Sequence, residues 1–370
     1  MTGPWLPVPA LQGGSVPRMW DGLAQEFAAR GHEVLIIARS FPGQAASETQ
    51  NGVRYLRFGG FSQSGLIYLD LIKDFFYATR TVSRLPAADI VVINDFWLPF
   101  LVGWSRRTIG RLVVSANRFP KRQYALYRSV DRVIAASRLI ENAIICQTPA
   151  MTGKVRRIPN PLDTRRFVPP SDERHGRVGK KILYVGRVHP EKGLHVLITA
   201  FAGIASKYSD VVLEIVGPVA SDQGGAGKRY LRDLQRLADG LPVTFSPPEF
   251  NLDKLVATYQ RADLFCYPSL AEKGEALPVA PLEAMSTGLP IIVSQLECFK
   301  DFVKNGENAL SFNHRNRDPA SALSAKLDAA LQNWDQTKRL GDIARVTAKR
   351  YAIDRVAGEF LAEFEQILCQ

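Results

Sequence analysis

Short apolar runs alternate with amphipathic stretches along most of the 370-residue chain. Most of the runs are continuous and rich in β-branched residues, which is typical of parallel strands buried on both faces. They predict strands at 33–38, 89–94, 112–117, 132–137, 181–186, 211–217, 242–246, 264–269 and 290–294. Between them lie helical patterns such as 16–31, where Met19, Leu23 and Phe27 recur at helical spacing before Gly31. The pattern therefore predicts an α/β protein.

The strand–helix series is interrupted once, at 160–180, by a segment rich in Pro, Gly and charge that predicts a linker. A chain of this length exceeds one ordinary core. We therefore expect two doubly wound domains, 1–165 and 166–351. From about residue 318 the pattern is helical to the end of the chain.

Composition places the chain among soluble globular proteins, with 46% hydrophobic and 22% charged residues. The richest apolar patch, 96–104, is shorter than the roughly 18 residues that a spanning helix needs. The N-terminus lacks the order of regions found in a signal peptide. The four cysteines form no C-x-x-C pair, which predicts neither a disulfide framework nor a zinc site. We expect a cytoplasmic protein.

Positive charge is concentrated in the first part of the sequence. Residues 1–160 hold 20 Lys and Arg against 10 Asp and Glu, and the rest of the chain holds 27 against 26. Arg106 and Arg107 and the segment 117–122 contribute to this excess. It indicates an anionic partner, either a membrane surface, a phosphorylated acceptor or nucleic acid, or else a generally basic solvated surface.

Candidate chemistry lies at predicted strand ends of the second half, where open parallel sheets bind ligands. After strand 181–186 come Gly186, Arg187 and Lys192, and a helix then opens. Two cations beside free helix N–H groups suit a diphosphate, although an Arg and a Lys on a solvated loop are the plain alternative. A Walker-type loop is absent. Ser246 ends another strand, before a proline-rigid loop suited to a nucleobase edge.

Two carboxylates flank a helix start at 275–283. Pro278 and Pro281 fit only the first turn of a helix, so Glu275 precedes the helix and Glu283 lies one to two turns inside it. Ala276, Leu277 and Val279 would supply backbone donors. The acids either stabilise the helix start or face a polyhydroxyl ligand, whose hydroxyls need both acceptors and donors.

The segments "IPNPLDTRRFVP", "ILYVGRVHPEKG", "ADLFCYPS" and "GEALPVAPLEAMSTGLPIIVS" together resemble the family 4 retaining glycosyltransferases of the GT-B fold. The resemblance implies two Rossmann-like domains facing a central cleft, with a C-terminal helix near 352–370 packing back on the first. It implies that Arg187 and Lys192 bind the donor diphosphate, Glu275 the transferred sugar and Glu283 the ribose. Pro278 stands where the family often has a glycine and removes one amide donor.

In the first half the resemblance assigns the phosphate-approaching glycine loop to Gly13 and Gly14, after Gln12. On the acceptor side it implies Asn117, with Arg118 and Lys121 nearby. The family often carries a histidine at the position of Asn117. Because Asn does not titrate near neutrality, a histidine-based proton role is not expected.

The segment before the glycine loop departs from the family, which begins with a short apolar strand. Pro4, Pro7 and Pro9 cannot donate to a ladder, so 1–10 is a poor central strand. The sequence predicts either that a strand lies upstream of Met1 or that the first sheet is one strand short, and it favours an upstream start.

Together with the resemblance, these features predict a retaining glycosyltransferase of hexosyltransferase type that moves a sugar from a nucleotide-sugar to a glycan or lipid-linked acceptor in cell-surface polysaccharide or glycoconjugate synthesis. We expect neither a metal or other cofactor nor a nucleic-acid partner. We do expect peripheral contact with the inner face of an anionic membrane. The alternatives are a sugar-nucleotide epimerase or phosphorylase on the same fold, and a basic, non-catalytic module that binds membranes or nucleic acid. The module does not explain why the motifs lie in the near-neutral half.

Overall fold

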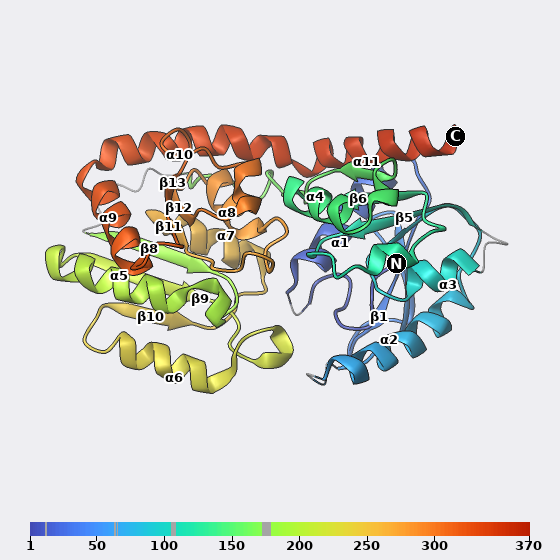
Figure 1. Cartoon of the computed structure of the whole chain (residues 1–370), viewed down its shortest axis with the longest axis horizontal. Coiled ribbons are helices and arrows are strands. Elements are labelled where there is room, and N and C mark those ends of the chain that lie inside the picture. Colours follow the sequence, from blue (N-terminus) through green and yellow to red (C-terminus); the bar gives the residue numbers. More distant parts are fainter. Residues whose placement is uncertain (12, 63, 65, 105–108, 172–178) are drawn as a thin grey trace. The chain divides into compact units, whose positions relative to one another are not determined.

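The computed structural model describes the whole chain except residues 12, 63, 65, 105–108 and 172–178 (Figure 1). Gln12, Arg106, Arg107 and part of the predicted linker therefore lie outside the described residues. The chain divides into two compact units. Unit 1 comprises Met1–Pro161 together with Ile353–Gln370, and unit 2 comprises Leu162–Ala352. Both units are α/β with parallel strands, as the apolar runs predict.

Unit 2 is built on one six-stranded parallel sheet of order β10-β9-β8-β11-β12-β13. Its strands are β8 (Lys180–Val185), β9 (Val211–Val216), β10 (Val243–Ser246), β11 (Leu264–Tyr267), β12 (Ile291–Ser294) and β13 (Leu310–Phe312). The first five match predicted strands, whereas β13 has only three residues. After β10 the chain returns to the other side of β8, so the strand order reverses between β8 and β11.

Helices connect these parallel strands, as the crossover between parallel strands requires. Between successive strands lie α5 (Leu194–Lys207), α6 (Gly227–Leu237), α7 (Leu252–Gln260) and α8 (Val279–Ser286), with 3-10 turns η3 (Pro190–Lys192), η4 (Ser221–Gln223) and η5 (Glu297–Asp301). After β13 come α9 (Pro319–Gln332), α10 (Trp334–Ala348) and the 3-10 turn η6 (Lys349–Tyr351). At the centre, β11 buries all four of its residues, and β8 buries Ile182, Leu183 and Tyr184. The continuous apolar runs thus lie where both faces are covered.

Unit 1 contains two sheets. One has the order β1-β3-β2 and is formed by β1 (Val34–Ser40), β2 (Ser47–Gln50) and β3 (Val53–Gly59). The other is parallel, with the order β4-β5-β6-β7, and is formed by β4 (Ala88–Ile93), β5 (Ile109–Ala116), β6 (Arg132–Ala135) and β7 (Val155–Arg157). Asn51 and Gly52, both at positive φ, turn the β2–β3 hairpin.

The first residues of the chain lie between these two sheets. Residues 1–10 form no continuous strand, in agreement with their three prolines, but only isolated bridges such as Thr2 to Asn94 and Pro7 to Arg39. The Thr2 amide donates to the Ile37 carbonyl of β1 at 3.0 Å, and the Asn94 amide donates to the Met1 carbonyl at 3.0 Å. This segment therefore contacts both sheets without completing a ladder.

The helices of unit 1 are α1 (Ser15–Ala29), α2 (Ile67–Val82), α3 (Leu98–Trp104), α4 (Arg138–Gln147) and α11 (Ile353–Leu368), with 3-10 turns η1 (Gln123–Leu126) and η2 (Pro149–Met151). The C-terminal helix α11 packs against α1 through a buried aromatic cluster of Phe27, Phe360 and Phe364. Burying a side chain of this size contributes about 1.5–3 kcal/mol. The apolar stripe predicted for 16–31 thus joins the two ends of the chain.

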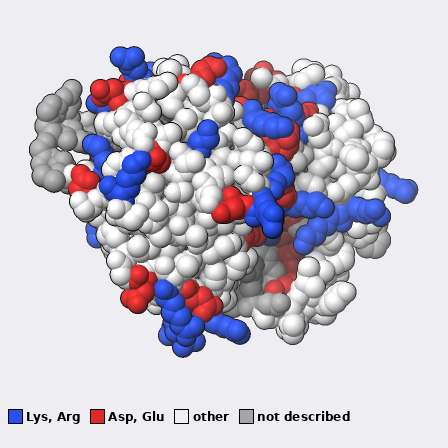
Figure 2. Space-filling view, turned by 60° about the vertical axis from the view of Figure 1, so that its left-hand side comes forward, with Lys and Arg blue, Asp and Glu red and all other residues white. Residues whose placement is uncertain are grey.

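α11 also changes the charge balance of the units. It lies in a segment, 353–370, with one basic and four acidic residues. Unit 1 therefore holds 21 Lys and Arg against 14 Asp and Glu, a net charge of +7, and unit 2 holds 26 against 22, a net charge of +4. On the face shown in Figure 2, basic and acidic side chains are interspersed. Both units are basic, with the larger excess in unit 1.

Candidate functional site

The carboxyl edge of the unit 2 sheet carries most of the candidate residues. The loops after β8 and β11 meet there, beside the point where the strand order reverses. Ligands of open parallel sheets bind at such a point because neighbouring loops diverge to opposite faces. The Leu270 amide donates to the Glu191 carbonyl at 2.8 Å and thereby ties the two loops together.

Arg187, directly after Gly186, is held in the loop that follows β8. Its Nη1 donates to the Gly224 carbonyl at 2.9 Å, and its Nη2 lies 2.6 Å from Glu191 Oε1. The Tyr184 hydroxyl donates to the Arg187 carbonyl at 3.0 Å and fixes the backbone from below. The Arg187 side chain is 40% exposed, so an anionic ligand can reach the guanidinium from solvent.

Lys192 ends the short helix η3 and is almost completely buried, with 4% of its surface exposed. Gly193 follows at φ 70°, and a Cβ at that position would lie 2.2 Å from the Pro268 carbonyl oxygen. Only glycine allows the two loops to approach this closely. The close approach brings the lysine ammonium to the loop that follows β11.

Glu275 is the partner of this lysine. Lys192 Nζ lies 2.6 Å from Glu275 Oε1, and the Ser269 hydroxyl donates to the same oxygen at 2.8 Å. Glu275 is 6% exposed. Charged groups are buried only when they are paired and hydrogen-bonded, as here. The structure thus brings together two of the three predicted catalytic residues, Lys192 and Glu275. The third, Arg187, is linked to Lys192 through Glu191, whose Oε1 lies 2.6 Å from Arg187 Nη2 and 3.8 Å from Lys192 Nζ.

Two stacked tyrosine rings lie next to this ion pair. The rings of Tyr184 and Tyr267 stack with centroids 5.6 Å apart, and Lys192 Nζ lies 5.8 Å from the Tyr267 centroid. Burial, together with the nearby Glu275 carboxylate, raises the pKa of both hydroxyls well above the usual value. Both phenols therefore remain protonated at neutral pH and act as hydrogen-bonding groups rather than as charges.

The helix expected after Glu275 begins where the prolines predict. Pro278 is the N-cap of α8, so Ala276 and Leu277 precede the helix and Val279 is its first residue. Glu283 lies in the second turn and is 2% exposed. The Tyr259 hydroxyl of α7 donates to Glu283 Oε2 at 2.7 Å. The second glutamate is thus held separately from the Lys192–Glu275 pair.

The loop that carries Glu275 is anchored at its other end by Glu272. The Glu272 carboxylate lies 2.8 Å from His314 Nε2 and 2.8 Å from Arg315 Nη2, both after β13. These two partners hold the pKa of Glu272 below its usual value even though partial burial acts to raise it. The ionised carboxylate therefore ties the loop after β11 to the loop after β13.

Ser246 lies at the end of β10, the edge strand of the same sheet. Its hydroxyl donates to Glu214 Oε1 at 3.2 Å, and its carbonyl accepts from the Gly217 amide at 3.3 Å. In the sheet, β9 and β8 lie between β10 and β11, so Ser246 is removed from the point where the strand order reverses. A nucleobase contact near Ser246 stays a prediction.

The remaining candidates belong to unit 1. Gly13 and Gly14 have φ of 75° and 99°, and Gly14 is the N-cap of α1. Asn117 follows β5, accepts from Asn94 Nδ2 at 2.8 Å and donates to Asn160 Oδ1 at 2.6 Å. Arg118 and Lys121 are exposed on the loop beyond it. The Asn117 amide is oriented by neighbours at the carboxyl edge of its own sheet.

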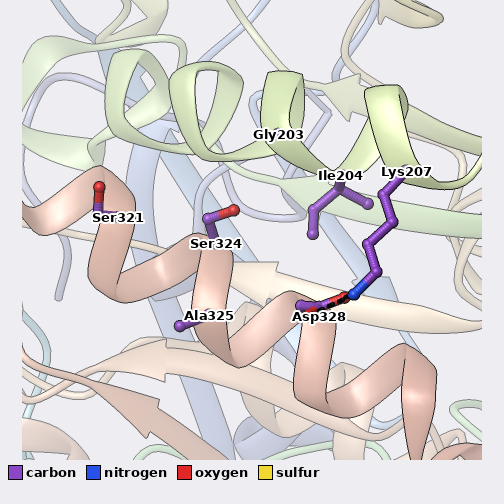
Figure 3. A pocket seen from close by; sticks show the side chains of 7 residues that line it. All are labelled: Gly203, Ile204, Lys207, Ser321, Ser324, Ala325 and Asp328. Atoms are coloured by element: carbon purple, nitrogen blue, oxygen red, sulfur yellow. Dashed lines mark hydrogen bonds and ion pairs between the residues drawn. The ribbon is translucent and has the colours of Figure 1, made fainter.

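A separate hollow lies between α5 and α9 and contains none of the candidate residues (Figure 3). It has a volume of about 260 Å³, and the exposed Lys207–Asp328 ion pair, with Nζ and Oδ1 2.7 Å apart, closes one end. Within the described part of the chain there is no group of three or more His, Cys, Asp or Glu suited to a metal ion. In the same part, every helix is too short or too polar to span a bilayer.

Several supporting residues were not predicted from the sequence. Ser269 and Glu191 orient predicted site residues through hydrogen bonds to Glu275 and Arg187. The hydroxyls of Tyr184 and Tyr259 donate to the Arg187 carbonyl and to Glu283. Glu191 stands inside the quoted "EKG" segment, so its position gave a signal. The tyrosines lie in apolar runs, where an aromatic residue is ordinarily part of the core.

Two family models match the chain. The model for group 1 glycosyl transferases matches residues 171–347, and the model for glycosyltransferase family 4 matches residues 16–166. Together they span most of both units. The chain therefore belongs to the glycosyltransferases of the GT-B fold, and it is an enzyme of the nucleotide-sugar-dependent kind.

Curated relatives agree with this assignment. The chain is 25% identical to a phosphatidyl-myo-inositol mannosyltransferase of Mycobacterium tuberculosis, over 93% of this chain and 91% of the relative. It is 24% identical to a D-inositol 3-phosphate glycosyltransferase of Corynebacterium urealyticum, over 96% of this chain and 83% of the relative.

Solved structures show the same fold. Sucrose-phosphate synthase from Thermosynechococcus elongatus superposes with a TM-score of 0.79 at 22% identity and covers 98% of this chain and 95% of its own. Anabaena HepE, solved in complex with UDP-glucose, gives a TM-score of 0.73 at 16% identity, over 97% of this chain and 98% of its own. The predicted family and fold are thereby confirmed.

Proposed function

We propose that this protein is a retaining glycosyltransferase that moves a hexose from a nucleotide-sugar donor to a glycan or lipid-linked acceptor in the synthesis of a cell-surface polysaccharide or glycoconjugate. The observation that carries the proposal is the buried Lys192–Glu275 pair beside Arg187, at the point where the strand order of the unit 2 sheet reverses. It offers cations for a diphosphate and a fixed carboxylate for sugar hydroxyls within one small region.

In this proposal Arg187 and Lys192 bind the donor diphosphate. Negative charge builds on the diphosphate as the glycosidic bond to it breaks. Cations that are already oriented stabilise that charge without reorganising. The Gly224 carbonyl and Glu191 orient Arg187, and Glu275 orients Lys192, which supports such preorganisation.

Glu275 would accept hydrogen bonds from hydroxyls of the transferred sugar. Lys192 and Ser269 both bind its Oε1, so this oxygen is held in place before any ligand arrives. We assign Glu275 no nucleophilic role. In the retaining route proposed here, the acceptor attacks the same face of the sugar from which the diphosphate departs, and a donor phosphate oxygen takes the acceptor proton.

The acceptor-side assignment is also part of this proposal. Asn117, with Arg118 and Lys121 beyond it, would bind the acceptor, and the backbone at Gly13 and Gly14 would approach the donor phosphates. The similar protein from Mycobacterium tuberculosis is named a phosphatidyl-myo-inositol mannosyltransferase. That name, together with the basic unit 1, supports a lipid-linked acceptor and peripheral contact with an anionic membrane.

The decisive experiment incubates the purified protein with a panel of UDP-, GDP-, ADP- and dTDP-sugars and detects free nucleoside diphosphate. Release from one donor class supports the proposal. An epimerase would instead convert the donor without releasing the diphosphate, and a binding module would leave every donor unchanged. For the reactive donor, proton NMR of the glycosylated product reports whether the anomeric configuration is retained.

Chelation tests the proposed independence from metal ions. Because Arg187 and Lys192 supply the charge that a metal would otherwise provide, EDTA is expected to leave the rate of nucleoside diphosphate release within about twofold. Restoration of a lost rate by Mg²⁺ or Mn²⁺ after dialysis would show that the two cations do not suffice.

Glu283→Gln is expected to weaken nucleotide binding with a smaller effect on turnover. A ribose contact acts in the ground state and the transition state alike, so its loss raises KM more than it lowers kcat. Loss of a charged acceptor costs about 1.5–3 kcal/mol, or roughly 10- to 150-fold in the Kd of the nucleoside diphosphate. Calorimetric titration measures this Kd directly.

Tyr259→Phe is the matched control for that variant. It removes the hydroxyl that binds Glu283 but keeps the ring that packs against Phe167 and Phe265. An intermediate loss of affinity is expected, since Glu283 keeps its charge. Unchanged nucleoside diphosphate affinity in Glu283→Gln would show that Glu283 has only a structural role.

A further inference from the structure

Helix α2 of unit 1 turns its apolar side chains outward. Its buried side consists of Asp74, Tyr77, Ala78 and Thr81. Large hydrophobic residues at its start and along its other side have exposed fractions of 38–81%, and they are Leu66, Ile67, Tyr68, Leu69, Ile72, Phe75 and Phe76. In a helix that only packs against its own core, the apolar stripe faces inward.

The exposed residues form one continuous surface. Tyr68, Ile72 and Phe76 are spaced four apart, so they lie on one face of the helix, with exposed fractions of 81%, 54% and 61%. The helix α3, which packs beside α2, exposes Phe100 to 49%. Single exposed apolar residues are ordinary, but a contiguous group of this kind marks an interaction surface. In Figure 1 α2 lies at the periphery of its unit.

The charges around this surface favour an anionic partner. Lys73 and Arg80 lie on α2 and Arg84 follows it, whereas its acids are Asp70 and Asp74. Asp70 binds Ser64 and lies 3.8 Å from Lys73. Burial and the neighbouring Asp95 raise the pKa of Asp74 to about 9, so that carboxyl is neutral at pH 7. The helix therefore presents a net positive charge beside its apolar face, on a unit whose net charge is +7.

We propose that the outward apolar face of α2 docks unit 1 onto the interface of a bilayer with anionic headgroups. Large apolar side chains enter the boundary of the acyl chains, while Lys73, Arg80 and Arg84 remain at the headgroups, as in helices that lie in the membrane plane. Anionic lipid attracts basic residues near the surface, and salt weakens that attraction. The proposal rests on the lipid-linked acceptor proposed above, because it explains why this enzyme would need to reach a membrane.

Charge also decides against a second copy of this chain as the occupant. A two-fold contact through α2 would place the same basic face against itself, and like charges across an interface oppose association. A bilayer also needs no matching concave surface, which suits a face formed mainly by one helix.

The test is flotation of the full chain with phosphatidylcholine vesicles and with vesicles containing one third phosphatidylglycerol. The unmodified protein is expected to float with the anionic vesicles at low salt. The triple variant Tyr68→Ser, Ile72→Ser, Phe76→Ser is expected to lower the bound fraction at least about tenfold. A triple variant at exposed apolar residues of unit 2, Leu237→Ser, Ile343→Ser, Val346→Ser, should float like the unmodified protein.

Release of nucleoside diphosphate in the absence of lipid separates this proposal from the proposed function, because it depends on the unit 2 site and not on α2. Equal flotation of the α2 triple variant and the unmodified protein would overturn the docking surface. A dimer in sedimentation velocity that the same variant dissociates, without vesicle binding by either protein, would overturn it in favour of a second copy. Circular dichroism checks that the variant is folded.

Discussion

Arg187→Ala is expected to lower turnover by about 30- to 900-fold, which corresponds to about 2–4 kcal/mol of lost transition-state stabilisation. The Arg187 guanidinium is partly exposed, and it donates to Glu191 and to the Gly224 carbonyl. Its removal leaves Glu191 with access to solvent, so the fold should persist. Initial rates of nucleoside diphosphate release, measured with the donor found by the panel, give kcat and KM.

Lys207→Ala is the matched control for this prediction. It removes another cation of unit 2 that lies in an ion pair, with Asp328, but on the hollow between α5 and α9. Exposed ion pairs contribute little to stability, and this one is outside the candidate site, so turnover should stay within about twofold. If Arg187→Ala is as active as Lys207→Ala, the diphosphate assignment is wrong.

Lys192→Met is expected to reduce both stability and turnover, because it leaves the Glu275 carboxylate buried without its cation. Breaking a buried ion pair from one side costs about 3–5 kcal/mol of unfolding free energy. The carboxylate has the Ser269 hydroxyl as a remaining donor, and little of its surface reaches water. Urea unfolding of the variant, compared with the unmodified protein, measures the loss.

The double variant Lys192→Met, Glu275→Gln separates the two effects. It removes both charges and keeps an acceptor for Ser269, so we expect most of the lost stability to return. Turnover should stay low by at least about a hundredfold, since neither the diphosphate cation nor the carboxylate is present. A stable double variant with normal turnover would show that the pair is structural and that the catalytic assignment is wrong.

Local pattern predicted much of unit 2. Its first five strands were expected from continuous apolar runs, and the start of α8 followed from Pro278 because the ring removes a donor and fixes φ. In unit 1 the β2–β3 hairpin was missed even though Asn51-Gly52 is a strong turn signal. The strand β2 is short and polar, and β3 mixes apolar residues with Arg54 and Arg57, so no continuous apolar run marked either strand.

Charge was predicted less well than the strands. The sequence places an excess of +10 in residues 1–160, but α11 returns to unit 1 and lowers the net charge of that unit to +7. The helix α2 shows the same limit for apolar residues. Its sequence identifies hydrophobic positions, yet which side of a helix is covered depends on the elements that pack against it.

The sequence by itself determined most of the strands, the family and the candidate site residues Arg187, Lys192, Glu275 and Glu283, because these depend on local spacing and short motifs. Only the tertiary structure decided that Lys192 and Glu275, 83 positions apart, form a buried pair and that Ser269 donates to the same Glu275 oxygen. It also decided that the Tyr259 hydroxyl donates to Glu283. The physical reason is the strand order. Pairing of β8 with β11 is a long-range choice made by the whole core, and it places two distant loops at one edge of the sheet.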